Sequence, residues 1–133
     1  YILGNPPYLG AKELSKEQKH DMEKILGNFG LAQRLDYIAC WFVKASCYIK
    51  NSNFEFAFVS TDSICQGEQV EMLWPYLFSN RLEISFAYKS FKWSNNAKNS
   101  AGITVIVVGL KNIKKNLKKI CRFKKSHYLC NRN

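Results

Sequence analysis

Tyr1-Ile2-Leu3-Gly4-Asn5-Pro6-Pro7-Tyr8 opens the chain, and this stretch decides how the rest of the sequence is interpreted. A short apolar run ends at a glycine and two prolines, and a proline cannot donate a hydrogen bond to a sheet. We therefore expect a strand to end here and the chain to leave the sheet. Each proline also restricts the residue before it, so the loop is stiff and holds Asn5 and Tyr8 in place.

Apolar spacing predicts helices and strands in alternation after this opening. Ser15 and Gln18 form the S-x-x-Q pattern of a capping box, and Pro75 predicts a kink or helix end. The helices are expected at 16–26, 35–49 and 67–78, the strands at 1–3, 54–60, 82–88 and 103–110, and a polar loop at 89–102. This order favours an α/β sheet with parallel first strands, and leaves an antiparallel pairing of the last two strands open.

Length and charge limit the classes of protein to consider. A chain of 133 residues, 47% hydrophobic and 14% aromatic, holds one globular domain or part of one. The net charge is +10, and residues 111–133 contribute +9 of it through seven Lys and two Arg without an acid. This basic segment is compatible with phosphate contacts, with a linker or with a solvated end.

Cysteines and histidines give no indication of a metal site. The five cysteines include no C-x-x-C pair, and His20 and His127 lack companion ligands at metal-binding spacing, so we expect no structural zinc and no disulfide framework. Cys40 and Cys47 fall on an apolar helix face, where cysteine usually acts as a small buried hydrophobe. No apolar run reaches the roughly 20 residues of a membrane span, and no leader is evident, so we expect a cytoplasmic protein without membrane association.

The Asn-Pro-Pro-Tyr tetrapeptide resembles the catalytic motif of S-adenosylmethionine-dependent amino-methyltransferases. Three further segments extend the resemblance: "LDYIACWFVKASCYI", "VSTDSICQGEQV" and "FKWSNNAKNSAGITVIVVGL". Together they look like the adenine-methyltransferase region of MmeI-like type II restriction-modification enzymes, from Tyr1 to about Leu110. The resemblance implies the C-terminal half of a Rossmann-like class I fold, with a mostly parallel sheet and a terminal antiparallel hairpin. We accordingly expect a partial methyltransferase domain at 1–110 and a basic tail or linker at 111–133.

The resemblance also implies roles for the motif residues. An exocyclic amine is a poor nucleophile until acceptors bind its hydrogens, and the Asn5 side-chain oxygen and the Pro6 carbonyl are the expected acceptors. Pro7 stiffens the catalytic loop, and the Tyr8 ring stacks on a base flipped out of double-stranded DNA. Asn5 is also the one residue expected to contact the cofactor S-adenosylmethionine.

Further substrate contacts are expected from two other places. The family uses an aromatic residue in the loop before the final strand to complete the base pocket, and Phe91 matches it, with Trp93 as a second candidate. Asp62, Ser63 and the stretch 66–69 follow a strand end, so they are expected either to border the ligand cleft or to cap the next helix.

The sequence departs from the family pattern in one large respect. The glycine-rich cofactor loop and the acidic ribose-binding residue of these enzymes normally precede the motif, and this chain has no G-x-G loop and nothing before Tyr1. We therefore expect a fragment that is inactive in isolation and that self-associates through an exposed sheet edge. The alternatives are a protein-glutamine or RNA amino-methyltransferase of the same fold, a noncatalytic nucleic-acid-binding remnant, or an α/β domain without activity.

Overall fold

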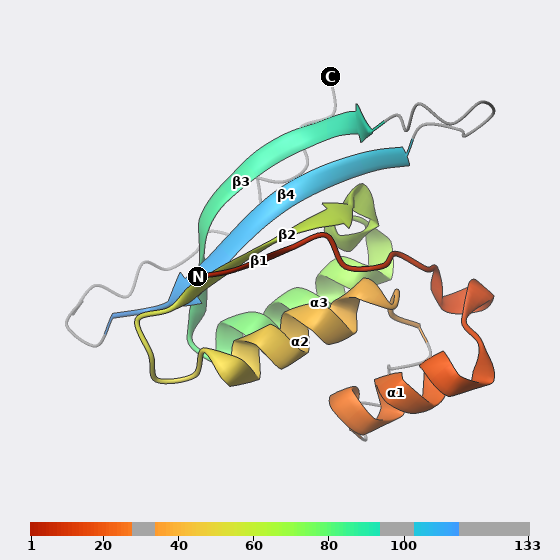
Figure 1. Cartoon of the computed structure of the whole chain (residues 1–133), viewed down its shortest axis with the longest axis horizontal. Helices are drawn as coiled ribbons and strands as arrows, with labels where there is room; N and C mark the ends of the chain where they lie inside the picture. Colours follow the sequence, from red (N-terminus) through yellow and green to blue (C-terminus); the bar gives the residue numbers. More distant parts are fainter. Residues whose placement is uncertain (28–33, 94–102, 115–133) are drawn as a thin grey trace.

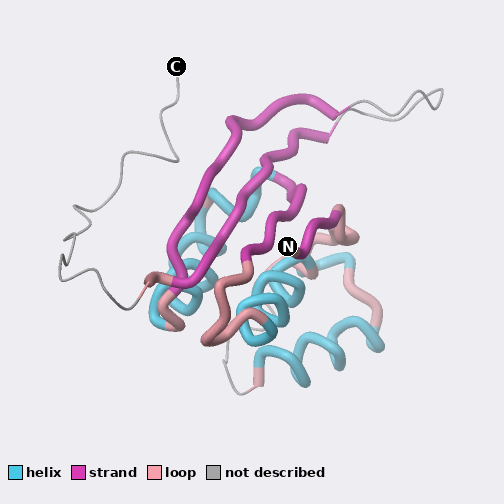
Figure 2. The backbone as a smooth tube through the Cα atoms, turned by 60° about the vertical axis from the view of Figure 1, so that its left-hand side comes forward, coloured by secondary structure: helices cyan, strands magenta, loops and turns pink. Residues whose placement is uncertain are grey.

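The computed structural model of the chain describes residues 1–27, 34–93 and 103–114. In this part of the chain, a four-stranded sheet carries helices on one face (Figures 1 and 2). The strands are β1 (Ile2–Gly4), β2 (Glu55–Thr61), β3 (Leu82–Trp93) and β4 (Ile103–Asn112). The α-helices are α1 (Lys16–Leu26), α2 (Ile38–Tyr48) and α3 (Gly67–Ser79), and short 3-10 helices are η1 (Ala11–Glu13) and η2 (Asp62–Cys65).

The strand order in the sheet is β1-β2-β4-β3. β1 pairs with β2 in parallel, whereas β4 runs antiparallel to both β2 and β3. β1, β2 and β3 therefore share one direction, and β4 is inserted between β2 and β3 in the opposite direction. The predicted α/β fold, with parallel first strands and an antiparallel final pair, is confirmed.

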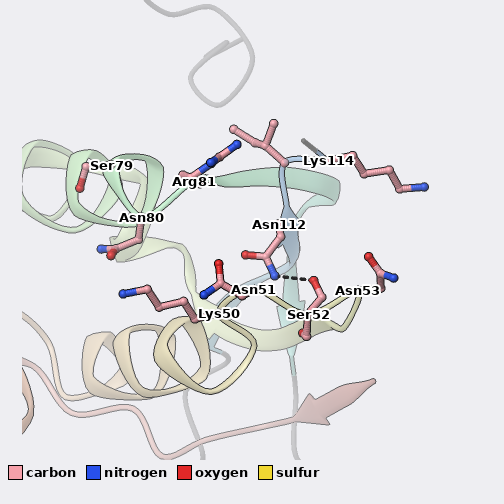
Figure 3. Close-up of a pocket in the computed structure, with 10 residues that line it drawn as sticks. Lys50, Asn51, Ser52, Asn53, Ser79, Asn80, Arg81, Asn112 and Lys114 are labelled. Atoms are coloured by element: carbon pink, nitrogen blue, oxygen red, sulfur yellow. Dashed lines mark hydrogen bonds between the residues drawn. The ribbon is translucent and has the colours of Figure 1, made fainter. Parts of the chain in front are cut away.

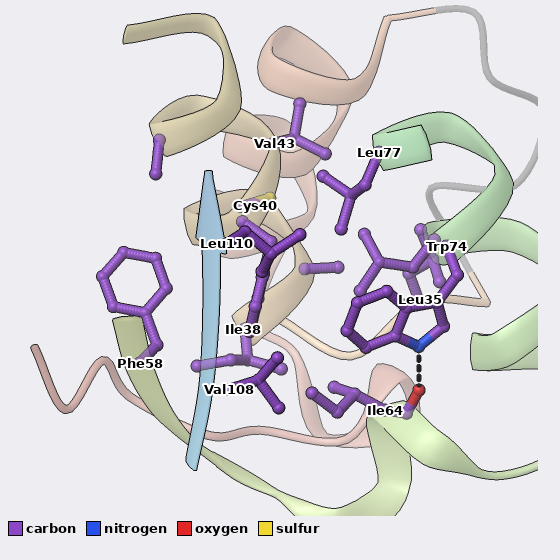
Figure 4. Close-up of a cluster of buried hydrophobic side chains, with 14 of the residues drawn as sticks. Leu35, Ile38, Cys40, Val43, Phe58, Ile64, Trp74, Leu77, Val108 and Leu110 are labelled. Atoms are coloured by element: carbon purple, nitrogen blue, oxygen red, sulfur yellow. Dashed lines mark hydrogen bonds between the residues drawn. The ribbon is translucent and has the colours of Figure 1, made fainter. Parts of the chain in front are cut away.

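The hydrophobic core lies between the sheet and helices α2 and α3 (Figure 4). Phe42 of α2 is fully buried and contacts the rings of Phe56, Phe58 and Trp74 edge-on, with ring centroids 5.4–6.3 Å apart. The Trp74 indole N–H donates to the Ile64 carbonyl over 2.7 Å, which satisfies the one polar atom of that side chain. This bond ties α3 to η2, the 3-10 helix that follows β2.

All three predicted helices are present, and only α2 and α3 differ from the expected ranges 35–49 and 67–78, at their ends. α1 has the predicted bounds and begins with the capping box, because Ser15 and Gln18 bond each other's backbone amides. α3 continues through Pro75 to Ser79, so of the two outcomes expected at this proline, a kink or a helix end, the helix end is wrong. Pro75 is exposed, and its ring therefore faces solvent on the side away from the core.

β3 is longer than predicted and contains two irregularities in its pairing with β4. The register shifts between Ile84 and Phe86 and again between Tyr88 and Phe91, which are the marks of β-bulges. After the first shift, the side chains that continue the period of two lie on the opposite face of the sheet. Leu82 and Ile84 lie toward the core, whereas Phe86 and Tyr88, in the same period-two pattern, are exposed.

The second shift keeps four aromatic side chains on one face of β3. Phe86, Tyr88, Phe91 and Trp93 are paired with Gly109, Val107, Val105 and Ile103, which alternate with the core residues of β4. These four rings, the aromatic row, therefore lie on the face of the sheet opposite to α2 and α3. Phe86 contacts Tyr88, and Phe91 contacts Trp93, with ring centroids 5.7 and 6.2 Å apart.

Candidate active site

The Asn-Pro-Pro-Tyr segment leaves the sheet at the carboxyl end of β1, as the opening sequence predicts. Pro6 is buried, Tyr8 is partly buried against the core, and Asn5 is exposed. The Tyr8 hydroxyl donates a hydrogen bond to the Asn5 side-chain oxygen. Burial raises the pKa of Tyr8 above its ordinary value, so this hydroxyl keeps its proton at neutral pH. The structure therefore brings the two side chains of the motif together.

The loop after the motif is tied to the start of α2. The Tyr37 amide donates to the Leu9 carbonyl over 2.9 Å, and the Ala11 amide donates to Oδ1 of Asp36 over 3.3 Å. Neither Pro6 nor Pro7 has an N–H, so the motif itself offers the surrounding backbone few bonds. These contacts just beyond the motif therefore hold it in place.

The segment at the end of β2 is hydrogen-bonded to the same residue, Asp36. Ser63 of η2 donates from Oγ to Oδ2 of Asp36 over 2.6 Å, and its Oγ lies 2.7 Å from Oγ1 of Thr61. Gln69 of α3 accepts from the Asp36 amide over 3.2 Å. Ser63 and Gln69 are thus brought beside the residues that follow the motif. Asp62 instead accepts a hydrogen bond from Gln66 within its own loop, over 3.1 Å.

A groove of about 440 Å³ lies beside β1 and the motif. Its lining is mainly apolar and comes from β1, from Asn5, Pro6 and Pro7, and from one side of α2. Trp41 and Tyr48 of α2 are exposed in it, and Lys44 contributes a cation. The motif thus borders a hollow between β1 and α2, to which Phe58 of β2 also contributes.

Phe91 and Trp93 lie on β3 and not in a loop, so the prediction of a loop from residue 89 is wrong for 89–93. β3 is an edge strand, so it needs a pairing partner on one side only, and residues 91–93 pair with β4. The side chains of 89–93 are exposed to solvent, so a polar sequence is compatible with a strand here. The remaining part of the predicted loop, 94–102, lies outside the described residues. Polarity alone therefore did not distinguish an exposed strand from a loop.

The structure places the two aromatics at the same end of the sheet as Asn5, but not beside it. β2 and β4 lie between β1 and β3, which corresponds to roughly 14 Å at the usual strand spacing. The rings of Phe91 and Trp93 contact each other, and each side chain is exposed by a little over 40%. Asn5 and Tyr8 form one group, and Phe91 and Trp93 form a second group across the sheet.

A second hollow, of about 600 Å³, lies at the opposite end of the sheet (Figure 3). It is lined by polar and basic residues that follow α2, precede β3 and end β4. Asn112 donates to the carbonyls of Ile49 and Ser52 over 2.6 and 2.9 Å and so closes this end. The Asn51–Asn53 cluster indicates only a helix end in sequence, which is why the hollow was not predicted.

The cysteines of the described residues differ in burial. Cys40 and Cys65 are buried, as predicted for Cys40, but Cys47 is exposed, so the prediction of a buried side chain is wrong for Cys47. Cys121, Cys130 and His127 lie outside the described residues. Within the described ranges, His, Cys, Asp and Glu form no group of three or more that could hold a metal ion. Over the same ranges, no helix has the length and hydropathy to cross a membrane.

Comparison with known proteins identifies relatives over most of the chain. The family model of the MmeI DNA-methyltransferase domain matches residues 1–122. DNA methyltransferase A of Bacillus subtilis (strain 168) is 52% identical over 109 residues, which cover 82% of this chain and 12% of that protein. A solved structure of the type IIL restriction-modification enzyme MmeI in complex with DNA superimposes with a TM-score of 0.80 at 42% identity. That superposition covers 86% of this chain and 16% of the MmeI chain.

The chain therefore spans a small part of the length of the proteins it matches. The family match nevertheless includes the motif, the α2 segment, the β2 end and the final strand pair on which the resemblance was based. On these grounds, the chain belongs to the MmeI DNA-methyltransferase domain family.

Proposed function

We propose that the chain forms part of the catalytic domain of a DNA methyltransferase, and that this enzyme methylates the N6 amine of adenine in a specific DNA sequence. The methyl donor is S-adenosylmethionine, and the parent enzyme belongs to a restriction-modification system. One observation carries the proposal: in a chain of this family, Asn5 stands exposed at the carboxyl end of a strand, oriented by Tyr8. Ligands of open α/β sheets bind at that edge.

The proposed chemistry depends on the acceptors of the motif. The lone pair of an exocyclic amine is delocalised into the ring, and acceptors for its hydrogens make the nitrogen more nucleophilic. The Asn5 oxygen has two lone pairs, and the Tyr8 hydroxyl uses one of them, which leaves the other for an amine hydrogen. The Pro6 carbonyl is the second acceptor, and the Tyr8 ring stacks on the flipped base. The protein contributes mainly position and electrostatics.

The residues present fit one side of a cofactor site. S-adenosylmethionine supplies a methyl group bonded to a positively charged sulfur. Asn5 borders the groove beside β1 and would contact the cofactor there. The sequence contains no G-x-G loop, so under this proposal the remaining cofactor contacts come from other parts of a longer polypeptide.

The proposal includes the partners of the enzyme. Double-stranded DNA is the substrate, and the protein acts in the cytoplasm. Phe91 and Trp93 contact the flipped base or the nucleotides beside it from across the sheet, and residues 1–110 and 111–133 form catalytic and basic parts. The isolated chain is inactive and self-associates through the β1 edge.

The test is a methyl-transfer assay with the full-length methyltransferase and methyl-labelled S-adenosylmethionine. DNA is incubated with the enzyme and digested to nucleosides, and the labelled nucleoside is identified. We expect label on N6-methyladenine with the unmodified enzyme and near-complete loss with Asn5→Ala. Asn5 is exposed, so the free energy of unfolding of this variant should lie within about 0.5 kcal/mol of that of the unmodified protein.

Each other outcome contradicts a stated part of the proposal. Label on protein or RNA instead of DNA would assign the enzyme to the alternative substrate class. Label on DNA that persists in Asn5→Ala would remove Asn5 from the mechanism. Absence of any label, with salt-sensitive DNA binding retained, would favour a noncatalytic nucleic-acid-binding remnant.

A further inference from the structure

Asp36 joins two parts of the chain that meet at the candidate site. Oδ1 accepts a hydrogen bond from the Ala11 amide over 3.3 Å, and Oδ2 accepts from Oγ of Ser63 over 2.6 Å. Ala11 follows the motif loop after β1, whereas Ser63 lies in η2 after β2. One carboxylate therefore spans the ends of two neighbouring parallel strands, with one oxygen directed to each.

The position of Asp36 is itself fixed from several sides. Its amide donates to Oε1 of Gln69 over 3.2 Å, and the buried Gln69 side chain donates in turn to the Arg34 carbonyl over 3.0 Å. The next residue, Tyr37, donates its amide to the Leu9 carbonyl over 2.9 Å. The carboxylate is thus held between α3 and the motif loop and is not a freely rotating surface group.

The motif depends on such an external anchor. Pro6 and Pro7 cannot donate backbone hydrogen bonds, and β1 is short, so the strand alone fixes the loop weakly. Just after the motif, the Leu9 carbonyl and the Ala11 amide form hydrogen bonds, and both go to the Asp36–Tyr37 pair. A displacement of the loop at this point would move Asn5 relative to the end of β2.

We propose that Asp36 is a positioning residue for methyl transfer, because it sets the motif loop at a fixed distance from the β2 end through Ala11 and Ser63. This inference rests on the proposed function for its catalytic consequence, but its structural part does not. Asp36 touches neither base nor cofactor in this role. It acts through the position of Asn5.

The hydrogen-bond pattern and not the negative charge is what the role requires. An asparagine at this position would accept from Ala11 with its oxygen and donate to Oγ of Ser63 with its nitrogen. Ser63 can turn its own proton toward Oγ1 of Thr61, which lies 2.7 Å away. Asp36→Asn should therefore preserve the arrangement, whereas Asp36→Ala removes both contacts.

The experiment compares Asp36→Ala, Asp36→Asn and Ser63→Ala in the full-length methyltransferase. Glu71→Ala is the matched control, since it removes an exposed carboxylate of α3 outside this cluster. Methyl transfer to DNA gives kcat and the KM values for DNA and S-adenosylmethionine. Amide hydrogen exchange of the segment 8–14 gives the anchoring of the loop without reference to activity.

We expect Asp36→Ala to lower kcat on the order of tenfold to hundredfold, with both KM values within about threefold, because the loss is one of geometry. Exchange in 8–14 should accelerate while exchange in β2 is unchanged. Asp36→Asn should stay within about threefold of the unmodified kcat, and Ser63→Ala should fall between the two. Glu71→Ala should change neither kcat nor the amide hydrogen exchange of 8–14.

Unmodified kcat in Asp36→Ala, or unchanged exchange in 8–14, would overturn the inference, as would an equal loss in Asp36→Asn. If Asp36→Ala does not fold, Ser63→Ala decides in its place, and unmodified kcat and exchange there would overturn it. Failure of the proposed function is distinct: the unmodified enzyme would transfer no methyl group to DNA, while the exchange measurement would still test the anchor.

Discussion

Tyr8 has two separable contributions at the scale of single residues, since its ring packs against the core and its hydroxyl bonds to Asn5. Tyr8→Phe removes the hydroxyl and keeps the ring, so methyl transfer should fall by less than about tenfold. Tyr8→Ala also removes the surface on which the base stacks, and aromatic stacking on a base contributes about 1–3 kcal/mol. The kcat and KM of both variants check this, and equal losses would contradict a stacking role for the ring.

The thiols provide a second prediction at this scale. Burial, with a smaller contribution from Asp21, raises the pKa of the Cys40 thiol to about 11. The thiolate is the reactive form, so roughly one Cys40 in a thousand is reactive at pH 8. This fraction rises tenfold with each pH unit as the pH approaches the pKa of Cys40.

Alkylation with iodoacetamide followed by mass spectrometry measures this difference. At pH 8, the exposed Cys47 should be labelled and Cys40 should not, and Cys40 labelling should increase as the pH approaches 11 while the fold is intact. Equal labelling of the two cysteines at pH 8 would show that the α2 face carrying Cys40 is open in solution.

Gly109 gives a prediction at the scale of the elements, where the aromatic row meets β4. A side-chain carbon at this position would lie within 2.8 Å of Cζ of the Phe86 ring, so the ring must move if the glycine is replaced. Phe86 is 42% exposed and can rotate outward, which keeps the expected cost of Gly109→Ala near 1 kcal/mol. Denaturant unfolding of Gly109→Ala with and without Phe86→Ala tests this. The cost of the glycine change should vanish when the ring is absent, and an unchanged cost would contradict the contact.

The elements also show what local sequence could and could not predict. The capping box at Ser15, the proline-stopped strand and the apolar spacing of α2 act within a few residues, and these signals located their elements correctly. The face of β3 was not predictable in this way. Leu82, Ile84, Phe86 and Tyr88 follow one period of two, yet a bulge divides them between the core and the outer face. A bulge depends on the pairing with β4, which the sequence of β3 does not contain.

The candidate site shows the same division between local and long-range information. Asn5 and Tyr8 are three positions apart and could be assigned together from the motif. Asp36 could not, because its partners Ala11 and Ser63 are distant in sequence and meet only through the parallel pairing of β1 with β2. A single Asp before a helix is typical of a helix cap, so nothing in the local pattern distinguished it.

At the scale of the whole molecule, the outer edge of β1 predicts self-association of the isolated 133-residue chain. Leu3 is 75% exposed on this strand, and Trp41 and Tyr48 are exposed in the adjoining groove. An apolar edge of this kind favours pairing with another chain. Light scattering at micromolar concentration should give a mass above that of a monomer. Leu3→Lys should lower it, whereas Lys16→Ala, a change on exposed α1 surface, should not. A monomeric mass for the unmodified chain would contradict the prediction.

The second bulge of β3 has a consequence for how natural relatives differ in length. Three steps along β3, from Tyr88 to Phe91, match two steps along β4, so one residue of this stretch has no counterpart across the strand pair. Loss of Lys89 or Ser90 would restore regular pairing and leave Phe91 and Trp93 on their present face. Loss of a residue between Phe91 and Trp93 would instead turn the end of the strand over. Gaps of one residue in homologous sequences should therefore accumulate at 89–90 and be rare at 91–93. The positions of such gaps in related sequences would then reflect the pairing register of β3 with β4.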